Sequence, residues 1–208
     1  MATDKLLSDV AGYYASKLAA HGQTPQGVDW NGEDSQVLRF EQLARIIAQP
    51  AFGLADVGCG YGAMLEYLRP RFPEMQYVGC DISQEMVLAA RARYGESPTA
   101  SFVVGAHPPA PADYCVASGI FNVRLGRGDE EWFEYLTEML DIMDRASVRG
   151  FAFNCLTSYS DRDRMRDYLY YADPCRLFDF CKRRYAREIA LLHDYGLYEF
   201  TMLVRKTT

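Results

Sequence analysis

A short apolar stretch that ends in an acid and runs into three alternating glycines constrains this chain most. Residues 52–57 read Phe-Gly-Leu-Ala-Asp-Val, and glycines follow at positions 58, 60 and 62. Helical periodicity begins directly afterwards, with Met64, Leu65 and Leu68. The pattern predicts a buried parallel strand, a tight turn and the start of a helix. Glycine suits such a turn because, without a Cβ, the backbone adopts positive φ and lets a ligand approach main-chain N–H groups.

A second acid follows the next apolar run. Asp81 closes the run Tyr77-Val78-Gly79-Cys80, which we expect to form the second strand. A carboxylate at the end of a parallel strand can accept hydrogen bonds from both hydroxyls of a ribose. The glycine turn and this acid, in a strand–turn–helix–strand context, together predict a site for a nucleoside cofactor.

The kind of nucleoside is less constrained, since Gly58, Gly60 and Ala63 also satisfy the dinucleotide pattern G-x-G-x-x-A. Asp56 argues against a dinucleotide because an acid beside the turn repels a pyrophosphate, whereas it attracts the ammonium of a methionine moiety. A third glycine in the turn and a hairpin-like segment at the end of the chain also disagree with a nicotinamide cofactor.

The stretch from Leu54 to Gly62, with Asp81 and Ile82 after it, resembles motifs I and II of the class I S-adenosylmethionine-dependent methyltransferases. The resemblance extends more loosely from Asn31 to Lys206. It implies a Rossmann-like α/β fold, with a seven-stranded sheet that is mostly parallel, an antiparallel last strand near residues 197–204, and helices on both faces. It also implies S-adenosylmethionine as cofactor and S-adenosylhomocysteine as product.

The resemblance implies which residues surround the cofactor. Asp56 and the turn at 58–60 would hold its methionine end, Asp81 its ribose, and Ile82 one face of its adenine. Many members carry an acid after the third strand that binds the adenine amino group. Here residues 102–107 read Phe-Val-Val-Gly-Ala-His, so we expect backbone groups at Ala106 to contact the adenine edge instead.

Two further residues complete the predicted cofactor site. Arg39 lies on a helix expected over residues 33–48, where its guanidinium either clamps the methionine carboxylate or is merely solvated. Ser118 begins the loop after the fourth strand, which should pass the sulfonium. The predicted cofactor-binding residues are Arg39, Asp56, Gly58, Cys59, Gly60, Asp81, Ile82, Ala106 and Ser118.

The acceptor side is predicted from three residues at the same rim: Tyr14, Asn122 and Asn154. We expect residues 1–30, which contain a helix over 4–20, to lie over the cofactor site as a lid. Alternatively, the tyrosines of that helix only pack it down. The segment 158–185 mixes aromatic and cationic residues and is predicted to be a second part of the lid. Its alternative is amphipathic helices with aromatics inside and charges in water.

Length and charge limit the remaining possibilities. A chain of 208 residues with 49% hydrophobic content predicts one domain, spanning residues 1–208. Its net charge of −6 disfavours nucleic acid and favours a small-molecule acceptor. We expect a cytoplasmic protein, because neither a leader pattern nor a membrane-spanning stretch is recognisable. We expect it to be a monomer or a homodimer. Its six cysteines are expected to be reduced and structural, and no metal site is predicted.

The sequence therefore predicts an enzyme that transfers a methyl group to oxygen or nitrogen of a small molecule by in-line displacement. An activated methyl needs mainly alignment and exclusion of water, so a catalytic base is optional. Two alternatives stay open at this point. One is a module that binds S-adenosylmethionine without catalysis, and the other is a nicotinamide-dependent oxidoreductase.

Overall fold

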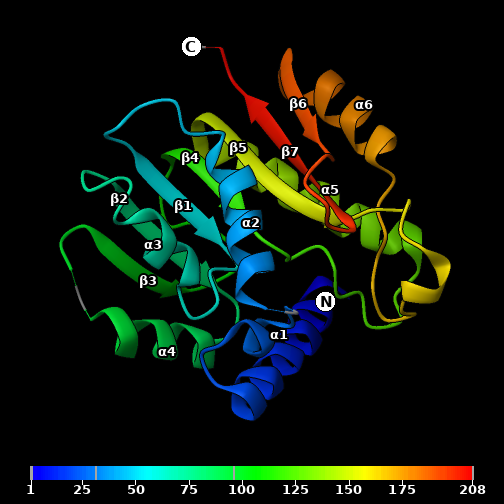
Figure 1. The fold of residues 1–208 in the computed structure, drawn as a ribbon, viewed down its shortest axis with the longest axis horizontal. Coiled ribbons are helices and arrows are strands. Elements are labelled where there is room, and N and C mark those ends of the chain that lie inside the picture. The colour runs from blue at the N-terminus through cyan, green and yellow to red at the C-terminus, as the bar shows by residue number, and fades with distance from the viewer. Residues whose placement is uncertain (1, 31, 96, 208) are drawn as a thin grey trace.

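The computed structural model describes residues 2–30, 32–95 and 97–207, so both ends of the predicted domain, residues 1 and 208, lie outside the described residues. One sheet runs through the molecule in the strand order β3-β2-β1-β4-β5-β7-β6 (Figure 1). All strands run parallel except β7, which pairs antiparallel with both β5 and β6. The strands are β1 (Gly53–Val57), β2 (Gln76–Asp81), β3 (Ala100–Val104), β4 (Ala112–Ala117), β5 (Ser147–Leu156), β6 (Glu188–Leu192) and β7 (Glu199–Arg205).

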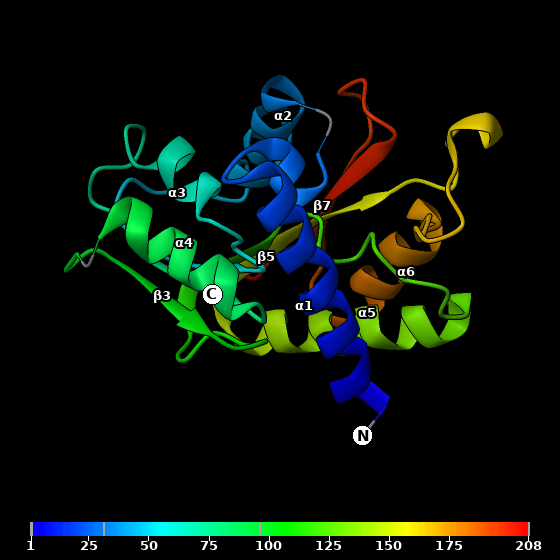
Figure 2. The same cartoon turned by 90° about the horizontal axis from the view of Figure 1, so that it is seen from below.

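Helices cover both faces of the sheet, as Figure 2 shows. One face packs against α2, α3 and α4, and the other against α5 and α6, with a separate apolar cluster on each side. Helix α1 crosses the edge where the parallel strands end (Figures 1 and 2). The helices are α1 (Ala2–His21), η1 (Pro25–Val28), α2 (Glu33–Ala44), α3 (Ala63–Leu68), α4 (Gln84–Tyr94), α5 (Asp129–Arg145), η2 (Arg162–Arg164) and α6 (Pro174–Arg184).

The arrangement confirms the predicted fold class, and the burial pattern explains it. A sheet covered on both faces needs strands that are apolar on both sides. In β7, Phe200 and Met202 pack into one cluster while Leu203 packs into the other, and all three are fully buried. None of the described helices is long and apolar enough to cross a membrane.

Local differences from the predicted elements are small. Helix α2 ends at Ala44 rather than at 48, because the chain tightens there into turns in which Ile46 N–H donates to Leu43 and Ile47 N–H donates to Ala44. Residues 158–185 form the short η2 and a single longer helix, α6, which is the crossover from β5 to β6.

A buried ion pair fastens α2 to β7. Arg39 Nε donates to Glu199 Oε2 at 2.8 Å, and Nη2 donates to Oε1 at 2.6 Å. The exposed fractions of the two side chains are only 6% and 1%. Arg39 Nη1 also donates to the carbonyl of Ser35 at 2.7 Å. The planar guanidinium is therefore held in a bidentate geometry with most of its donors used.

Replacing Glu199 by alanine should destabilise the fold strongly, because it leaves the Arg39 cation buried without its partner. We expect Glu199→Ala to lower the free energy of unfolding by about 3–5 kcal/mol in denaturant titrations. Asp179→Ala removes a carboxylate from an exposed pair with Arg183 and should change it by no more than about 0.5 kcal/mol. Similar decreases in the free energy of unfolding of the two variants would contradict a special role for the buried pair.

Candidate active site

The glycine turn after β1 is closed by its own hydrogen bonds. Gly58 and Gly60 have φ values of +70° and +55°, and a Cβ at Gly58 would lie 2.1 Å from Cγ2 of Ile120. The N–H groups of Gly58 and Cys59 both donate to the carbonyl of Cys80, at 2.8 and 3.1 Å. The expectation that turn N–H groups at these positions point at a ligand is therefore wrong, since they hold the neighbouring strand instead.

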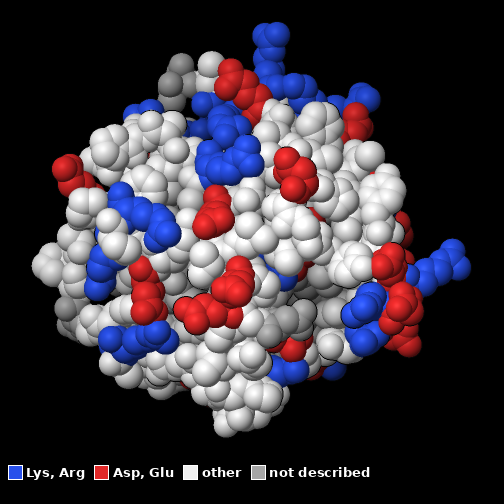
Figure 3. All heavy atoms as spheres, viewed as in Figure 1, with Lys and Arg blue, Asp and Glu red and all other residues white. Residues whose placement is uncertain are grey.

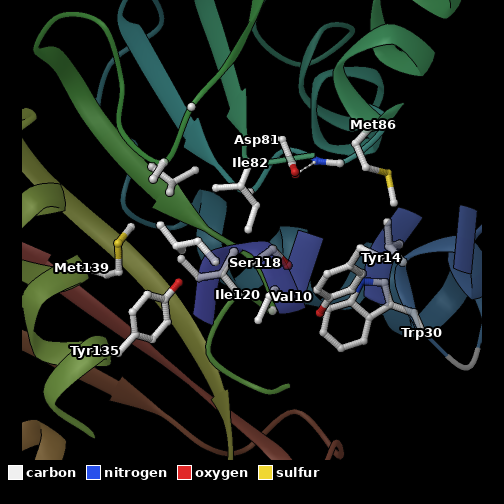
Figure 4. Close-up of a pocket in the computed structure, with 18 residues that line it drawn as sticks. Val10, Tyr14, Trp30, Asp81, Ile82, Met86, Ser118, Ile120, Tyr135 and Met139 are labelled. Atoms are coloured by element: carbon white, nitrogen blue, oxygen red, sulfur yellow. Dashed lines mark hydrogen bonds between the residues drawn. The ribbon is translucent and has the colours of Figure 1, made fainter. Parts of the chain in front are cut away.

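Asp81, the last residue of β2, is buried and doubly anchored. Its Oδ2 accepts from the N–H of Gly60 at 2.9 Å, and its Oδ1 accepts from the N–H of Ser83 at 2.8 Å. Burial raises the pKa of this carboxyl, and the two backbone donors oppose that rise. A carboxylate has about four lone-pair sites, so each oxygen retains capacity for a ligand hydroxyl. The first of these hydrogen bonds is the dashed line in Figure 4.

A pocket of about 670 Å³ opens beside Asp81 at the carboxyl ends of the strands (Figure 4). Its walls come from α1, the segment after η1, the glycine turn, the loops after β2, β3 and β4, and α5. The lining residues are Leu7, Val10, Tyr14, Val28, Trp30, Val57, Gly58, Gly60, Asp81, Ile82, Met86, Gly105, Ala106, Ser118, Gly119, Ile120, Tyr135 and Met139.

A second hollow of about 340 Å³ adjoins the first and shares part of its wall, including Trp30, Gly58 and Ser118. Asp56, Cys59, Gln36 and Tyr61 line it on the far side of the turn. The two hollows thus form one elongated site, with Asp81 in the larger part and Asp56 in the smaller.

Most of the predicted cofactor residues come together around this site. Tyr14 of α1 also lies there, as the lid prediction requires. The Ser118 hydroxyl is buried and makes no hydrogen bond with any residue that the structure describes. Such an unpaired buried group is costly, so it marks a position for a ligand atom. The predicted residues that line one or both hollows are Asp56, Gly58, Cys59, Gly60, Asp81, Ile82, Ala106, Ser118 and Tyr14.

Arg39 does not line either hollow. Its guanidinium is bound to Glu199 and stacks 3.8 Å from the ring centroid of Trp30, so its charge is already taken up by an acid of the protein. Sequence reasoning placed it on the inner face of its helix, which is right, but missed the acid on β7 that takes up the charge.

Asn154 and Asn122, predicted on the acceptor side, hold loops instead of lining the site. Asn154 Oδ1 accepts from the N–H of Gly119 at 2.8 Å, and its Nδ2 donates to Glu199 at 2.8 Å. Asn122 Oδ1 accepts from the N–H of Leu156 at 3.2 Å. Both amides are buried, so their hydrogen-bonding groups are directed inward.

The segment 158–185 contributes none of the described residues that line the two hollows. Tyr170 is buried in the apolar cluster under α5 and α6, and α6 buries Leu177 and Cys181 while its charged residues face water. This is the amphipathic alternative that the sequence left open. Tyr168 still approaches α1 from outside, with its ring centroid 6.3 Å from that of Tyr13.

Sequence reasoning missed four large side chains in the wall: Trp30, Met86, Tyr135 and Met139. Trp30 lies in an irregular segment, where no helical or strand periodicity indicates which side chains are buried. Tyr135 and Met139 are four residues apart on α5 and were interpretable only as part of its apolar stripe. In Figure 4 the Tyr135 hydroxyl points into the pocket, and burial raises the pKa of Tyr135 and of Tyr14, so both hydroxyls stay protonated.

Asp56 has an unusual environment for an acid. The hydroxyl of Tyr77 donates to its Oδ2 at 2.5 Å, and the side chain is otherwise enclosed. Burial raises the pKa of Asp56 to about 7, although the Tyr77 hydrogen bond works in the opposite direction. A cationic ligand group beside this carboxyl would stabilise its charged form.

Comparison with known proteins agrees with this geometry. A methyltransferase domain model matches residues 54–144. A Mycobacterium tuberculosis protein, "Putative methyltransferase Rv1506c", is 57% identical over 161 residues, which cover 77% of this chain and 97% of the relative. The trans-aconitate 2-methyltransferase of Afipia carboxidovorans is 34% identical over 141 residues, or 57% of this chain. The match spans only about half, 53%, of that relative's length.

Solved structures share the fold at low sequence identity. The complex of DhpI with S-adenosylhomocysteine matches with a TM-score of 0.66 and 14% identity over 96% of both chains. Human N-acetylserotonin methyltransferase, solved with S-adenosylmethionine, matches with a TM-score of 0.59 and 15% identity, over 85% of this chain and 57% of its own. Together, the strand order, the glycine turn with Asp81 and these relatives show that the chain belongs to the S-adenosylmethionine-dependent methyltransferases and uses S-adenosylmethionine as its methyl donor.

Proposed function

We propose that this chain, as a single domain, methylates oxygen or nitrogen of a small molecule that enters beneath α1. The observation that carries the proposal is the continuous site joining Asp56, Asp81 and Tyr14. It is a concave, mostly apolar pocket, which suits a small acceptor. On the face seen in Figure 3, basic and acidic side chains intermingle without a continuous basic field, which supports the same choice.

The cofactor residues are proposed from the fit of this site to S-adenosylmethionine. Asp56 would face the ammonium in the smaller hollow, and Asp81 the ribose hydroxyls in the larger one. Ile82 and Ala106 would enclose the adenine. The unpaired hydroxyl of Ser118 lies where the two hollows meet, so it would gain a hydrogen-bond partner from the ligand. Arg39, Asn122 and Asn154 are not part of this proposal, because their polar groups are bound elsewhere.

S-adenosylmethionine, when bound, would supply a methyl group activated by its sulfonium: a lone pair of the acceptor would bond to the methyl carbon as the C–S bond breaks with its electron pair left on sulfur, and the proton of the acceptor would be released. The chain's own task is to orient the acceptor and exclude water. Leu7, Val10 and Tyr14 of α1 form the wall that does so. Asp29 fixes this helix, because it accepts from the Tyr13 hydroxyl and from Lys17 Nζ, each at 2.7 Å.

The non-catalytic alternative that the sequence left open is not retained, because the chain belongs to a family of methyltransferases. Tritium release from methyl-labelled S-adenosylmethionine, measured with candidate acceptors, distinguishes an enzyme from a binding module. The nicotinamide alternative is not retained, since the family is shown by the relatives above.

Removing the Asp81 carboxylate should weaken cofactor binding. Asp81→Ala loses two charge-assisted hydrogen bonds to the ribose and releases the N–H of Gly60, so we expect a loss of roughly 2–4 kcal/mol for S-adenosylhomocysteine in calorimetry. Glu74→Ala, which removes an exposed acid just before β2, is the control and should bind normally. Unchanged affinity in a folded Asp81→Ala protein would place the ribose elsewhere.

Cofactor affinity should depend on pH through Asp56. In the free protein this acid is largely protonated below its pKa of about 7, whereas an ammonium ligand requires it charged. Affinity for S-adenosylhomocysteine should therefore rise by up to tenfold per pH unit as pH increases toward about 7. It should level off above about 7, because Asp56 is then charged while the ammonium of the ligand, which belongs to a free amino acid, keeps its proton. Calorimetry between about pH 5.5 and 8.5 measures this profile.

Asp56→Asn is the control for that profile. Because the amide does not titrate in this range, the rise in affinity should vanish and the affinity should change little with pH. A rise in affinity that persists in Asp56→Asn would assign the pH dependence to another group.

A further inference from the structure

The walls of the two hollows carry charge of one sign only. Among their described lining residues, Asp56 and Asp81 are charged, and there is no lysine, arginine or histidine. The remaining wall is mostly apolar, with Leu7 and Val10 from α1 and Ile120 from the loop after β4. The three histidines of the chain, at positions 21, 107 and 193, are exposed and line neither hollow.

Three cations on neighbouring elements and loops are already paired with acids. Lys17 Nζ donates to Asp29 at 2.7 Å, and Arg127 bridges Asp9 and Glu131 at 2.8 and 3.1 Å. Arg39 is bound to Glu199 behind the ring of Trp30. Redirecting any of these groups to an anion in the pocket would leave its present acid unpaired, which is most costly for the buried pair.

Several relatives are trans-aconitate 2-methyltransferases, so the charge of the wall can be compared with the charge of trans-aconitate. Trans-aconitate carries three carboxylates and no internal positive charge, so burying it requires cations from the protein. The carboxylate of S-adenosylmethionine differs, because the same molecule carries an ammonium beside it. The wall formed by α1 and α5, where we place the acceptor, therefore offers no described cation to a polycarboxylate.

We propose that the acceptor of this chain is an uncharged molecule with a largely apolar body, and that the chain does not methylate trans-aconitate or other polycarboxylates. The proposal rests on the proposed function and specifies its acceptor. The hydroxyls of Tyr14 and Tyr135 line the larger hollow and make no hydrogen bond with any described residue. They are the groups available to orient a neutral hydroxyl, carbonyl or amine.

Trans-aconitate is the decisive probe. Protein saturated with S-adenosylhomocysteine is titrated with trans-aconitate by calorimetry, and protein with S-adenosylmethionine is assayed for the methyl ester by mass spectrometry. The enzyme of Afipia carboxidovorans serves as the positive control for the ester. We expect no saturation up to about 1 mM and no ester. Saturable binding with ester formation would overturn the inference about the acceptor, whereas failure of S-adenosylhomocysteine to bind would instead contradict the proposed function.

A pair of variants tests whether charge is the cause. Leu7→Lys places a cation in the wall of the larger hollow, and Leu7→Gln is the neutral control of similar length. Leu7→Lys should strengthen trans-aconitate binding to the S-adenosylhomocysteine complex at least about tenfold relative to Leu7→Gln. Equal binding by the two folded variants would show that shape rather than charge excludes the tricarboxylate, and so would overturn the proposal.

Discussion

The shape of the site depends on the hydrogen bonds and the ion pair that the Glu199 carboxylate makes. It binds Arg39 from α2 and Asn154 from β5, and Asn154 in turn accepts the N–H of Gly119 in the loop after β4. This junction exists because β7 runs antiparallel, which brings its first residue to the edge where β4 and β5 end. Gly119 can sit there only as glycine, since a Cβ would lie 2.4 Å from the Trp30 ring. One buried acid thus positions two walls of the pocket.

Asp81 has a comparable double role nearer the ligand. Its carboxylate orders the glycine turn through Gly60, and the same carboxylate lines the pocket. One group therefore both shapes the turn and is available to a ligand. Asp56 differs because its carboxyl group has only one described hydrogen bond, which comes from the hydroxyl of Tyr77. Its charge depends on a cationic partner, which is why its response to pH should report ligand binding.

The sequence predicted those parts of the structure that local pattern determines. The strand, the turn and Asp81 lie within one short βαβ segment, so their spacing was enough. Arg39 and Glu199 are 160 residues apart, and nothing in either neighbourhood indicates the other. Asn154 was also predicted at the rim, but its amide points inward and accepts the N–H of Gly119. The sequence around Asn154 does not indicate this contact. For 158–185 the sequence predicted a lid and left amphipathic helices as the alternative. In the structure α6 packs its apolar side into the cluster under α5, a contact that the sequence does not indicate.

The two halves of the site are built by different means, and this explains why the methyl donor is easier to infer than the acceptor. The cofactor half rests on strand ends and backbone groups, which the fold itself supplies and which structures at 14% identity share. In our proposal the acceptor half is formed by side chains of α1, the segment after η1 and α5. Single substitutions there change the charge of the wall without disturbing the sheet. Similarity to trans-aconitate methyltransferases around the cofactor therefore does not by itself fix the acceptor, which is why the proposal for it is argued from the wall.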